Sequence, residues 1–263
     1  MKLSIDASLA FSTDHPVDCL LQWEVAATPE QRIAKGVTTL PASIPIHRVA
    51  AQDGLGERFW LTAQGEVKMR YQAEVEVDRP AADFDALHKA AMTDLPAETT
   101  QYLFDSRFCA AETFQTFVTD EFGHLSGGTR IKAMRDWIAD HFTYAAGSSG
   151  PATTARDSFV SRRGVCRDFA HVMTALARAS GMPARYVSCY APDVTPQDFH
   201  AVTEVWLADG EGHGGWTLVD ATGMADPRET AAIGIGRDAA DVSFLTSFGA
   251  VEFGGHEVAV TRL

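Results

Sequence analysis

The sequence has few cysteines, no long apolar run and no excess of basic residues. Four cysteines among 263 residues are too few for a disulfide framework in a chain of this length. No apolar stretch is long enough to cross a bilayer, and polar side chains interrupt Met1–Asp6 too early for a secretory signal. The formal net charge of -13 argues against nucleic acid and anionic membranes as partners. We therefore expect a cytoplasmic protein that binds neither nucleic acid nor membrane.

Several motifs of known chemistry are also missing. There is no Gly-x-Ser-x-Gly nucleophile elbow and no phosphate-binding loop ending in Gly-Lys-Ser or Gly-Lys-Thr. The cysteines and histidines lack the paired short spacings of a structural zinc site. Residues 209–220 begin like a calcium-binding loop, but the twelfth residue is Asp220 rather than a bidentate Glu. The sequence thus predicts no metal site and no cofactor.

The first third of the chain has the pattern of β structure. Residues 67–77 alternate apolar and polar side chains, which is typical of a strand with one solvent-exposed face. Phe59–Leu61 precedes this strand across Gln64–Gly65, a pair of turn-forming residues. The pattern predicts a β-hairpin with its turn at Gln64–Gly65.

A change of pattern marks a domain boundary. Arg79–Pro80 ends the β-rich region, and a mixed connector containing Pro96 follows it. We predict an antiparallel β-rich N-terminal domain over residues 1–98. Residues 99–263 are predicted to form a second domain of helices and strands that ends in a strand at 257–260. The fold class expected for the whole chain is α+β.

Cys166 stands at the start of a predicted helix. Residues Asp168–Ser180 carry apolar side chains at helical spacing, directly after the cysteine. The positive end of a helix dipole and the unpaired backbone N–H groups favour the thiolate, which is the nucleophilic form. Burial in a core is the commoner fate of a cysteine, and Cys19 and Cys189 lie in apolar stretches that fit it. Cys109 follows no clear pattern, so Cys166 is the candidate nucleophile.

A histidine and an aspartate flank a predicted pair of strands downstream. Residues 201–207 and 216–220 read as strands, joined by the Gly-rich turn 209–215. If the strands pair around the middle of that turn, His200 faces Asp220, within one or two positions of register. A slip of one position would put the two side chains on opposite faces. The alternative is that His200 is an ordinary histidine at a strand end and Asp220 an ordinary turn residue. We favour His200 as a general base and Asp220 as the group that orients it.

Other polar residues near Cys166 receive structural interpretations. Asp168 lies in the first helical turn, where a carboxylate is favoured by the dipole and can cap the helix. His171 is about one and a half turns beyond Cys166 and points away from the thiol. For Arg163 and Arg167 we expect solvation or a local ion pair rather than contact with a substrate carboxylate.

The motifs around these residues resemble those of a known family, the bacterial transglutaminase-like cysteine peptidases. The resemblance covers roughly residues 102–241, and the region before it is similar to the β-rich N-terminal domain common in that group. It rests on a cysteine box, the segment that follows it, a histidine box and an aspartate box, which are Gly164–His171, Gly181–Val187, Phe199–Ala201 and Asp220–Thr222. It implies a papain-like, transglutaminase-like catalytic core behind the N-terminal β domain.

The chain also departs from the family pattern. Val202 stands where the family usually has Trp, and Ala221 stands where Pro often follows the aspartate. The turn 209–215 is longer and richer in Gly than usual. These differences bear on the substrate groove more than on the three proposed catalytic residues.

The predicted chemistry is attack of a thiolate on an amide carbonyl. His200 would deprotonate Cys166 and Asp220 would orient His200, while the backbone N–H of Cys166 stabilises the oxyanion. Tyr144 is a candidate second donor or a wall of the groove. The resulting thioester is resolved by water in a peptidase or amidase, or by an amine in a transglutaminase. We favour hydrolysis of a peptide or amide, protein substrates included, and retain acyl transfer and a non-catalytic binding module as alternatives.

Overall fold

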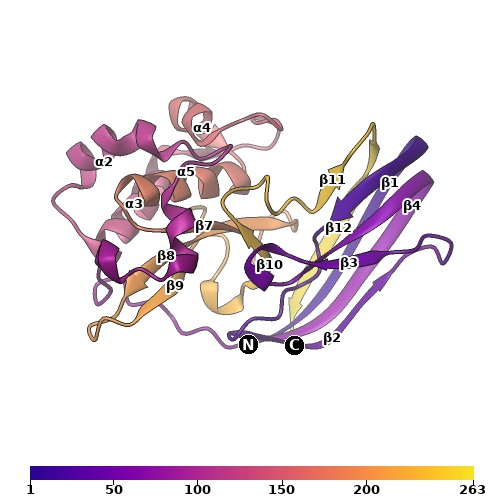
Figure 1. The fold of residues 1–263 in the computed structure, drawn as a ribbon, viewed down its shortest axis with the longest axis horizontal. Coiled ribbons are helices and arrows are strands. Elements are labelled where there is room, and N and C mark those ends of the chain that lie inside the picture. The colour runs from indigo at the N-terminus through magenta and orange to yellow at the C-terminus, as the bar shows by residue number, and fades with distance from the viewer.

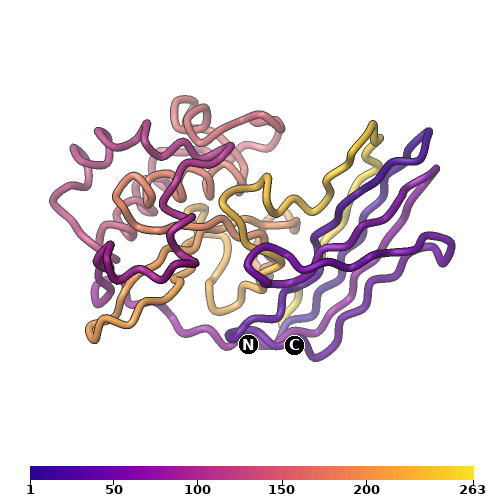
Figure 2. Tube along the Cα trace, viewed as in Figure 1, coloured from indigo at the N-terminus to yellow at the C-terminus, as the bar shows by residue number.

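A computed structural model describes residues 1–263 and contains three β sheets and five α-helices. The largest sheet lies on one side of the molecule and the helices gather on the other, beside the second sheet (Figure 1). The two ends of the chain lie next to each other at one end of the largest sheet (Figure 2). There the N–H of Leu263 donates to the carbonyl of Lys2 at 3.0 Å.

The largest sheet has six antiparallel strands and contains both the first and the last strand of the chain. The strands of this sheet are β1 (Lys2–Leu21), β2 (Gln31–Thr39), β3 (His47–Ala50), β4 (Glu57–Val77), β11 (Leu245–Ser247) and β12 (Glu252–Arg262). One face of β1 and β4 is buried, and successive side chains alternate between core and solvent. The alternation predicted for residues 67–77 is therefore confirmed, because it places every second side chain in the core.

The hairpin predicted at Gln64–Gly65 is wrong. The chain does not reverse there: residues 57–77 form one continuous strand, which pairs with β1 on both sides of Gly65. Gly65 has a positive φ of 73° and lies where the register with β1 shifts, between Thr13 and Val17. The glycine therefore accommodates an irregularity in a long strand pair instead of a turn, as β-bulges commonly do.

The C-terminal strand lies in the N-terminal sheet. The strand predicted at 257–260 is present as part of β12, but β12 pairs with β1, with Leu3 opposite Arg262 and Ser12 opposite Glu252. The last strand is thus hydrogen-bonded to the first part of the chain instead of to the core that precedes it. The boundary between residues 98 and 99 stays a prediction.

The second sheet positions the candidate site. Its strands run in the order β10 (Ala231–Gly236), β7 (Ala184–Tyr190), β8 (His200–Ala208) and β9 (Gly214–Val219), all antiparallel. Helix α5 (Cys166–Ala179) packs on one face, where the hydroxyl of Thr203 donates to the carbonyl of Ala170 at 3.0 Å. The predicted buried helix after Cys166 is therefore confirmed.

The remaining helices surround α5. They are α1 (Ala97–Thr100), α2 (Gln115–Phe122), α3 (Gly127–His141) and α4 (Ala155–Ser161), with short 3₁₀ turns at Gln52–Gly54, Met92–Asp94, Gln101–Leu103, Ala111–Phe114 and Pro227–Glu229. A two-stranded parallel sheet joins β5 (Thr143–Tyr144) to β6 (Arg163–Gly164). Antiparallel sheets with separate helices make this an α+β fold, as predicted.

None of the five α-helices combines the length and the apolar character needed to cross a membrane.

Candidate active site

Cys166 is the first residue of α5, and its neighbours fix that helix start. The Asp168 carboxylate accepts a hydrogen bond from the backbone N–H of Val165 at 2.8 Å and one from the Ser149 hydroxyl at 2.6 Å. This is the capping role predicted for Asp168. A Cβ atom at Gly164 would lie 2.5 Å from the Asp168 Cβ, so a side chain at position 164, two residues before the cysteine, would clash with the cap.

Cys166 is the only cysteine of the chain that is not fully buried. Cys19, Cys109 and Cys189 are each 0% exposed, whereas the Cys166 residue is partly exposed and borders a cavity. Burial raises the pKa of the other three thiols, to about 12 in Cys109. Those three cysteines are therefore kept as neutral thiols, while Cys166 is accessible to a substrate.

The histidine and aspartate predicted to interact do so, with an offset of two positions that lies within the predicted range of register. Thr203 pairs with Val219, so Asp220 continues the ladder opposite Val202, two positions from His200. Side chains alternate between the two faces of a sheet, so an offset of two positions keeps the two side chains on the same face. The Nε2 atom of His200 lies 3.0 Å from the Oδ2 atom of Asp220, with both side chains buried.

Asp220 is held by the loop that follows it. Its carboxylate accepts hydrogen bonds from the backbone N–H and the hydroxyl of Thr222, both at 2.8 Å, and from the Ala225 N–H at 2.8 Å. Burial alone would raise the pKa of Asp220, but the hydrogen bonds with His200 and with these donors outweigh it and lower the pKa. The buried carboxylate is therefore ionised and fixed in position.

His200 lies between this carboxylate and the thiol. Burial by itself would lower the pKa of His200, yet its hydrogen bond with Asp220 and the neighbouring Cys166 raise it to about 10. The second ring nitrogen, Nδ1, has no hydrogen-bond partner in the protein, and the Cys166 sulfur lies 3.9 Å from the carbonyl oxygen of Phe199. The imidazole can therefore bond the carboxylate through Nε2 and exchange a proton with the sulfur through Nδ1.

Tyr144 lies beside the same thiol. The pairing of β5 with β6 brings it there, since the N–H of Ala145 donates to the carbonyl of Gly164 at 2.8 Å. Its phenol lies close to the backbone and the sulfur of Cys166. Burial and the nearby Cys166 raise the pKa of Tyr144 to about 12, so the phenol keeps its proton and remains a donor.

A cavity of about 500 Å³ borders Cys166 and His200. Its lining includes Gln22, Thr246 and His256, which lie outside residues 102–241, the range of the family resemblance. Gln22 follows β1, Thr246 lies in β11 and His256 lies in β12. The largest sheet therefore forms part of the wall around the candidate nucleophile.

Part of that wall is a second histidine–aspartate pair with aromatic neighbours. The Nε2 atom of His256 lies 2.5 Å from Oδ1 of Asp198, and this hydrogen bond raises the pKa of His256. Phe199 stacks on Phe244 with ring centroids 4.8 Å apart, and both line the cavity. No sequence pattern indicated this group, because its members come from separate regions of the chain.

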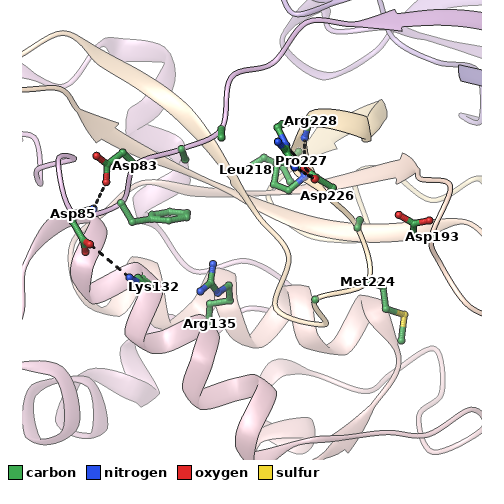
Figure 3. A pocket seen from close by; sticks show the side chains of 15 residues that line it. Asp83, Asp85, Lys132, Arg135, Asp193, Leu218, Met224, Asp226, Pro227 and Arg228 are labelled. Atoms are coloured by element: carbon green, nitrogen blue, oxygen red, sulfur yellow. Dashed lines mark hydrogen bonds and ion pairs between the residues drawn. The ribbon is translucent and has the colours of Figure 1, made fainter. Parts of the chain in front are cut away.

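A larger cavity, of about 860 Å³, lies behind the Asp220 loop (Figure 3). Its walls come mainly from the connector 81–85, α3 and the loop 223–228. Lys132 of α3 forms an ion pair with Asp85 of the connector at 3.7 Å. The lining contains no cysteine, serine or histidine, so this cavity holds no candidate nucleophile or imidazole base.

His171 lies away from the thiol, in keeping with its predicted structural role. Its Nε2 atom accepts a hydrogen bond from the N–H of Ala239 at 3.2 Å, and its ring stacks on Phe108. Complete burial lowers the pKa of His171 to about 3, so the imidazole is neutral.

Comparisons with known proteins agree with this architecture. The family model described as the transglutaminase-like superfamily matches residues 116–221. The structure is similar to that of a candidate cysteine protease from Cytophaga hutchinsonii, with a TM-score of 0.92 and 30% sequence identity over 99% of this chain and 90% of that chain. This chain belongs to the transglutaminase-like superfamily, which together with that relative supports a papain-like thiol enzyme in general terms.

Two mycobacterial relatives match a shorter part of the chain. An uncharacterised protein of Mycobacterium tuberculosis is 36% identical over an alignment of 126 residues, and the match covers 43% of this chain and 40% of the relative. One of Mycobacterium leprae is 30% identical over 118 residues, covering 43% of this chain and 42% of the relative. The matched region thus spans about two fifths of the length of these relatives.

Proposed function

We propose that the protein is a thiol-dependent amide hydrolase, a peptidase or amidase, with Cys166 as nucleophile, His200 as general base and acid, and Asp220 as the positioning residue. The observation that carries the proposal is the placement of one imidazole between a buried carboxylate and a partly exposed thiol. A nucleophile beside a base that is itself oriented by a third group is the arrangement that covalent catalysis requires.

In the first step His200 takes the thiol proton, and the Cys166 sulfur attacks the carbonyl carbon of the amide. A C–S bond forms while the carbonyl π electrons move to oxygen. The backbone N–H of Cys166 and the hydroxyl of Tyr144 are the two donors near this point, and they would stabilise the oxyanion. Asp220 stabilises the imidazolium that forms in the same step.

In the second step the C–N bond breaks as the imidazolium gives its proton to the leaving amine. The acyl group stays on Cys166 as a thioester. His200 then takes a proton from water, the hydroxide attacks the thioester carbonyl, and the C–S bond breaks to release the acid. The proton returns to the sulfur, so the enzyme is unchanged over the cycle.

Hydrolysis is favoured over acyl transfer because the Cytophaga hutchinsonii relative is described as a candidate cysteine protease. An amine in place of water would give a new amide from the same thioester. The two outcomes are separated by incubating a peptide substrate with and without a primary amine and weighing the products by mass spectrometry.

The proposal is tested by alkylating each cysteine with iodoacetamide as a function of pH and reading the modified sites by mass spectrometry. We expect Cys166 to react rapidly below about pH 7, because His200 holds its proton, and to lose this reactivity in His200→Ala. The buried Cys109 and Cys189 serve as internal controls that stay unreactive in the folded protein. Slow, free-thiol behaviour of Cys166 would instead favour a non-catalytic binding module.

A further inference from the structure

A buried carboxamide directly after strand β1 lines the cavity that contains the candidate nucleophile. Gln22, the residue after β1, is 2% exposed and borders the same cavity as Cys166 and His200. Its backbone N–H donates to the carbonyl of Phe244, but neither Nε2 nor Oε1 of its side chain has a hydrogen-bond partner. Unpaired buried amides are rare because they are destabilising, so this one requires a specific explanation.

The carboxamide has a defined place on the second sheet. A Cβ atom at Gly234 of β10 would lie 1.9 Å from Nε2 of Gln22, so the absence of a side chain at 234 makes room for the amide. Gly234 pairs with Ser188, and Ser188 pairs with Ala201, in one row across three strands. Ser188 and Ala201 also line the cavity.

That row sets the distance between the amide and the reaction centre. Neighbouring strands lie about 4.8 Å apart, so Gln22 is about 10 Å from Ala201, which adjoins His200 and packs against Cys166. This is too far for Gln22 to contact the reacting carbonyl. An extended peptide advances about 3.4 Å per residue, so the amide lies about three residues from the scissile bond.

The chemistry of the group identifies its ligand. A carboxamide carries both an acceptor and donors, which complements the N–H and C=O of another amide. Ile233, Phe244 and Ser188 line the cavity together with Gln22, and the charged side chains of the lining include Arg107, Arg167, Asp198 and His256. The carboxamide of Gln22 itself is neutral, so it complements a backbone amide rather than an ionic group.

We infer that Gln22 is a specificity-determining residue that binds a backbone amide of an extended peptide substrate, about three residues from the bond that is cut. The inference rests on the proposed function and deepens it: the substrate class is a peptide rather than a small amide. It also gives the largest sheet a role in substrate binding.

The test compares reagents that alkylate Cys166 but differ in length. Chloroacetamide carries no peptide, acetyl-trialanyl chloromethyl ketone extends from the acyl side, and chloroacetyl-trialanine amide extends from the leaving-group side. In Gln22→Met we expect the second-order alkylation rate of one of the two extended reagents to fall about tenfold, since one amide pair is lost. The rate with chloroacetamide stays unchanged.

Two further variants complete the test. Gly234→Ala displaces the carboxamide without removing it and is expected to lower the same rate. Gln115→Met, at the exposed start of α2, is the matched control and leaves every rate unchanged. Gln22→Met is expected to unfold at a temperature no lower than the natural protein, because it removes an unpaired buried amide.

Unaltered alkylation rates of Gln22→Met with both extended reagents overturn the inference. A Gln22→Met protein that is less thermally stable and reacts more slowly with all three reagents overturns it as well. Failure of Cys166 to react with any of the three reagents instead removes the proposed function, and the inference with it.

Discussion

The Nε2 atom of His200 lies 3.0 Å from Oδ2 of Asp220, although the two residues are offset by two positions across the β8–β9 pair. Side chains two positions apart on a strand share a face, so the offset keeps the two groups together. The contact then depends on the loop after β9, whose Thr222 and Ala225 donate to the carboxylate.

Asp220→Asn is expected to lower the rate of acylation by roughly 10³-fold or more, because a neutral amide neither stabilises the imidazolium nor fixes the tautomer of His200. The measurement is single-turnover thioester formation with a peptide substrate. Thr222→Ala is the control: it removes the hydroxyl donor to the carboxylate but leaves the backbone N–H donor and the charge, so its effect is expected to be much smaller. Equal rates for Asp220→Asn and the natural protein would contradict the assigned role.

Tyr144→Phe is expected to lower kcat by roughly 10²-fold with little change in KM, because one oxyanion donor is lost. The raised pKa of Tyr144, about 12, means that the phenol is still a donor at neutral pH. Alkylation of Cys166 by iodoacetamide passes through no oxyanion and is expected to stay at the natural rate. A parallel loss in both assays would show that Tyr144 only supports the shape of the site.

Gly164→Ala is expected to destabilise the protein by about 1–3 kcal/mol, because the new Cβ would lie 2.5 Å from the Asp168 Cβ. The clash falls on the helix start that carries Cys166, so thiol reactivity is expected to fall as well. Urea unfolding measures the first effect and alkylation the second. Gly210→Ala, where a Cβ meets no atom within 4 Å, is the control and leaves both values unchanged.

The stability of the protein is expected to fall in acid partly because of His171. Its pKa is lowered from 6.5 to about 3 in the folded state. Between these two pH values the unfolded chain binds a proton at His171 and the folded chain does not. The contribution is fully present above pH 6.5 and is lost as the pH falls toward 3, by about 2 kcal/mol between pH 7 and pH 5. Urea unfolding of His171→Phe over this range should show a shallower pH dependence. An identical slope would mean that His171 is protonated in the folded state.

The sequence alone predicts the parts of the molecule that local patterns determine. The start of α5 at Cys166, the alternation in β4 and the strand pair that carries His200 follow from spacing over a few residues. The pattern at Gly65 was misread, because a glycine in a strand can mark either a turn or a bulge and only the partner strand decides.

Contacts between distant segments are absent from any local pattern. The pairing of β12 with β1 joins residues about 250 positions apart, and nothing in either segment specifies the other. The same holds for Gln22 and His256, which reach the cavity only because the two sheets lie against each other. Their position at the cavity is visible in the fold and not in the sequence.

The pairing of β12 with β1 also sets an order on biosynthesis. β1 leaves the ribosome well before β12, so its edge along residues 3–12 finds its partner only when β12 has been made. Until then it is an open strand edge, the kind of surface through which nascent chains associate with one another. Because β12 carries His256, this part of the cavity wall forms only after Cys166 has been synthesised. The nascent chain therefore contains Cys166 before the cavity beside it is complete.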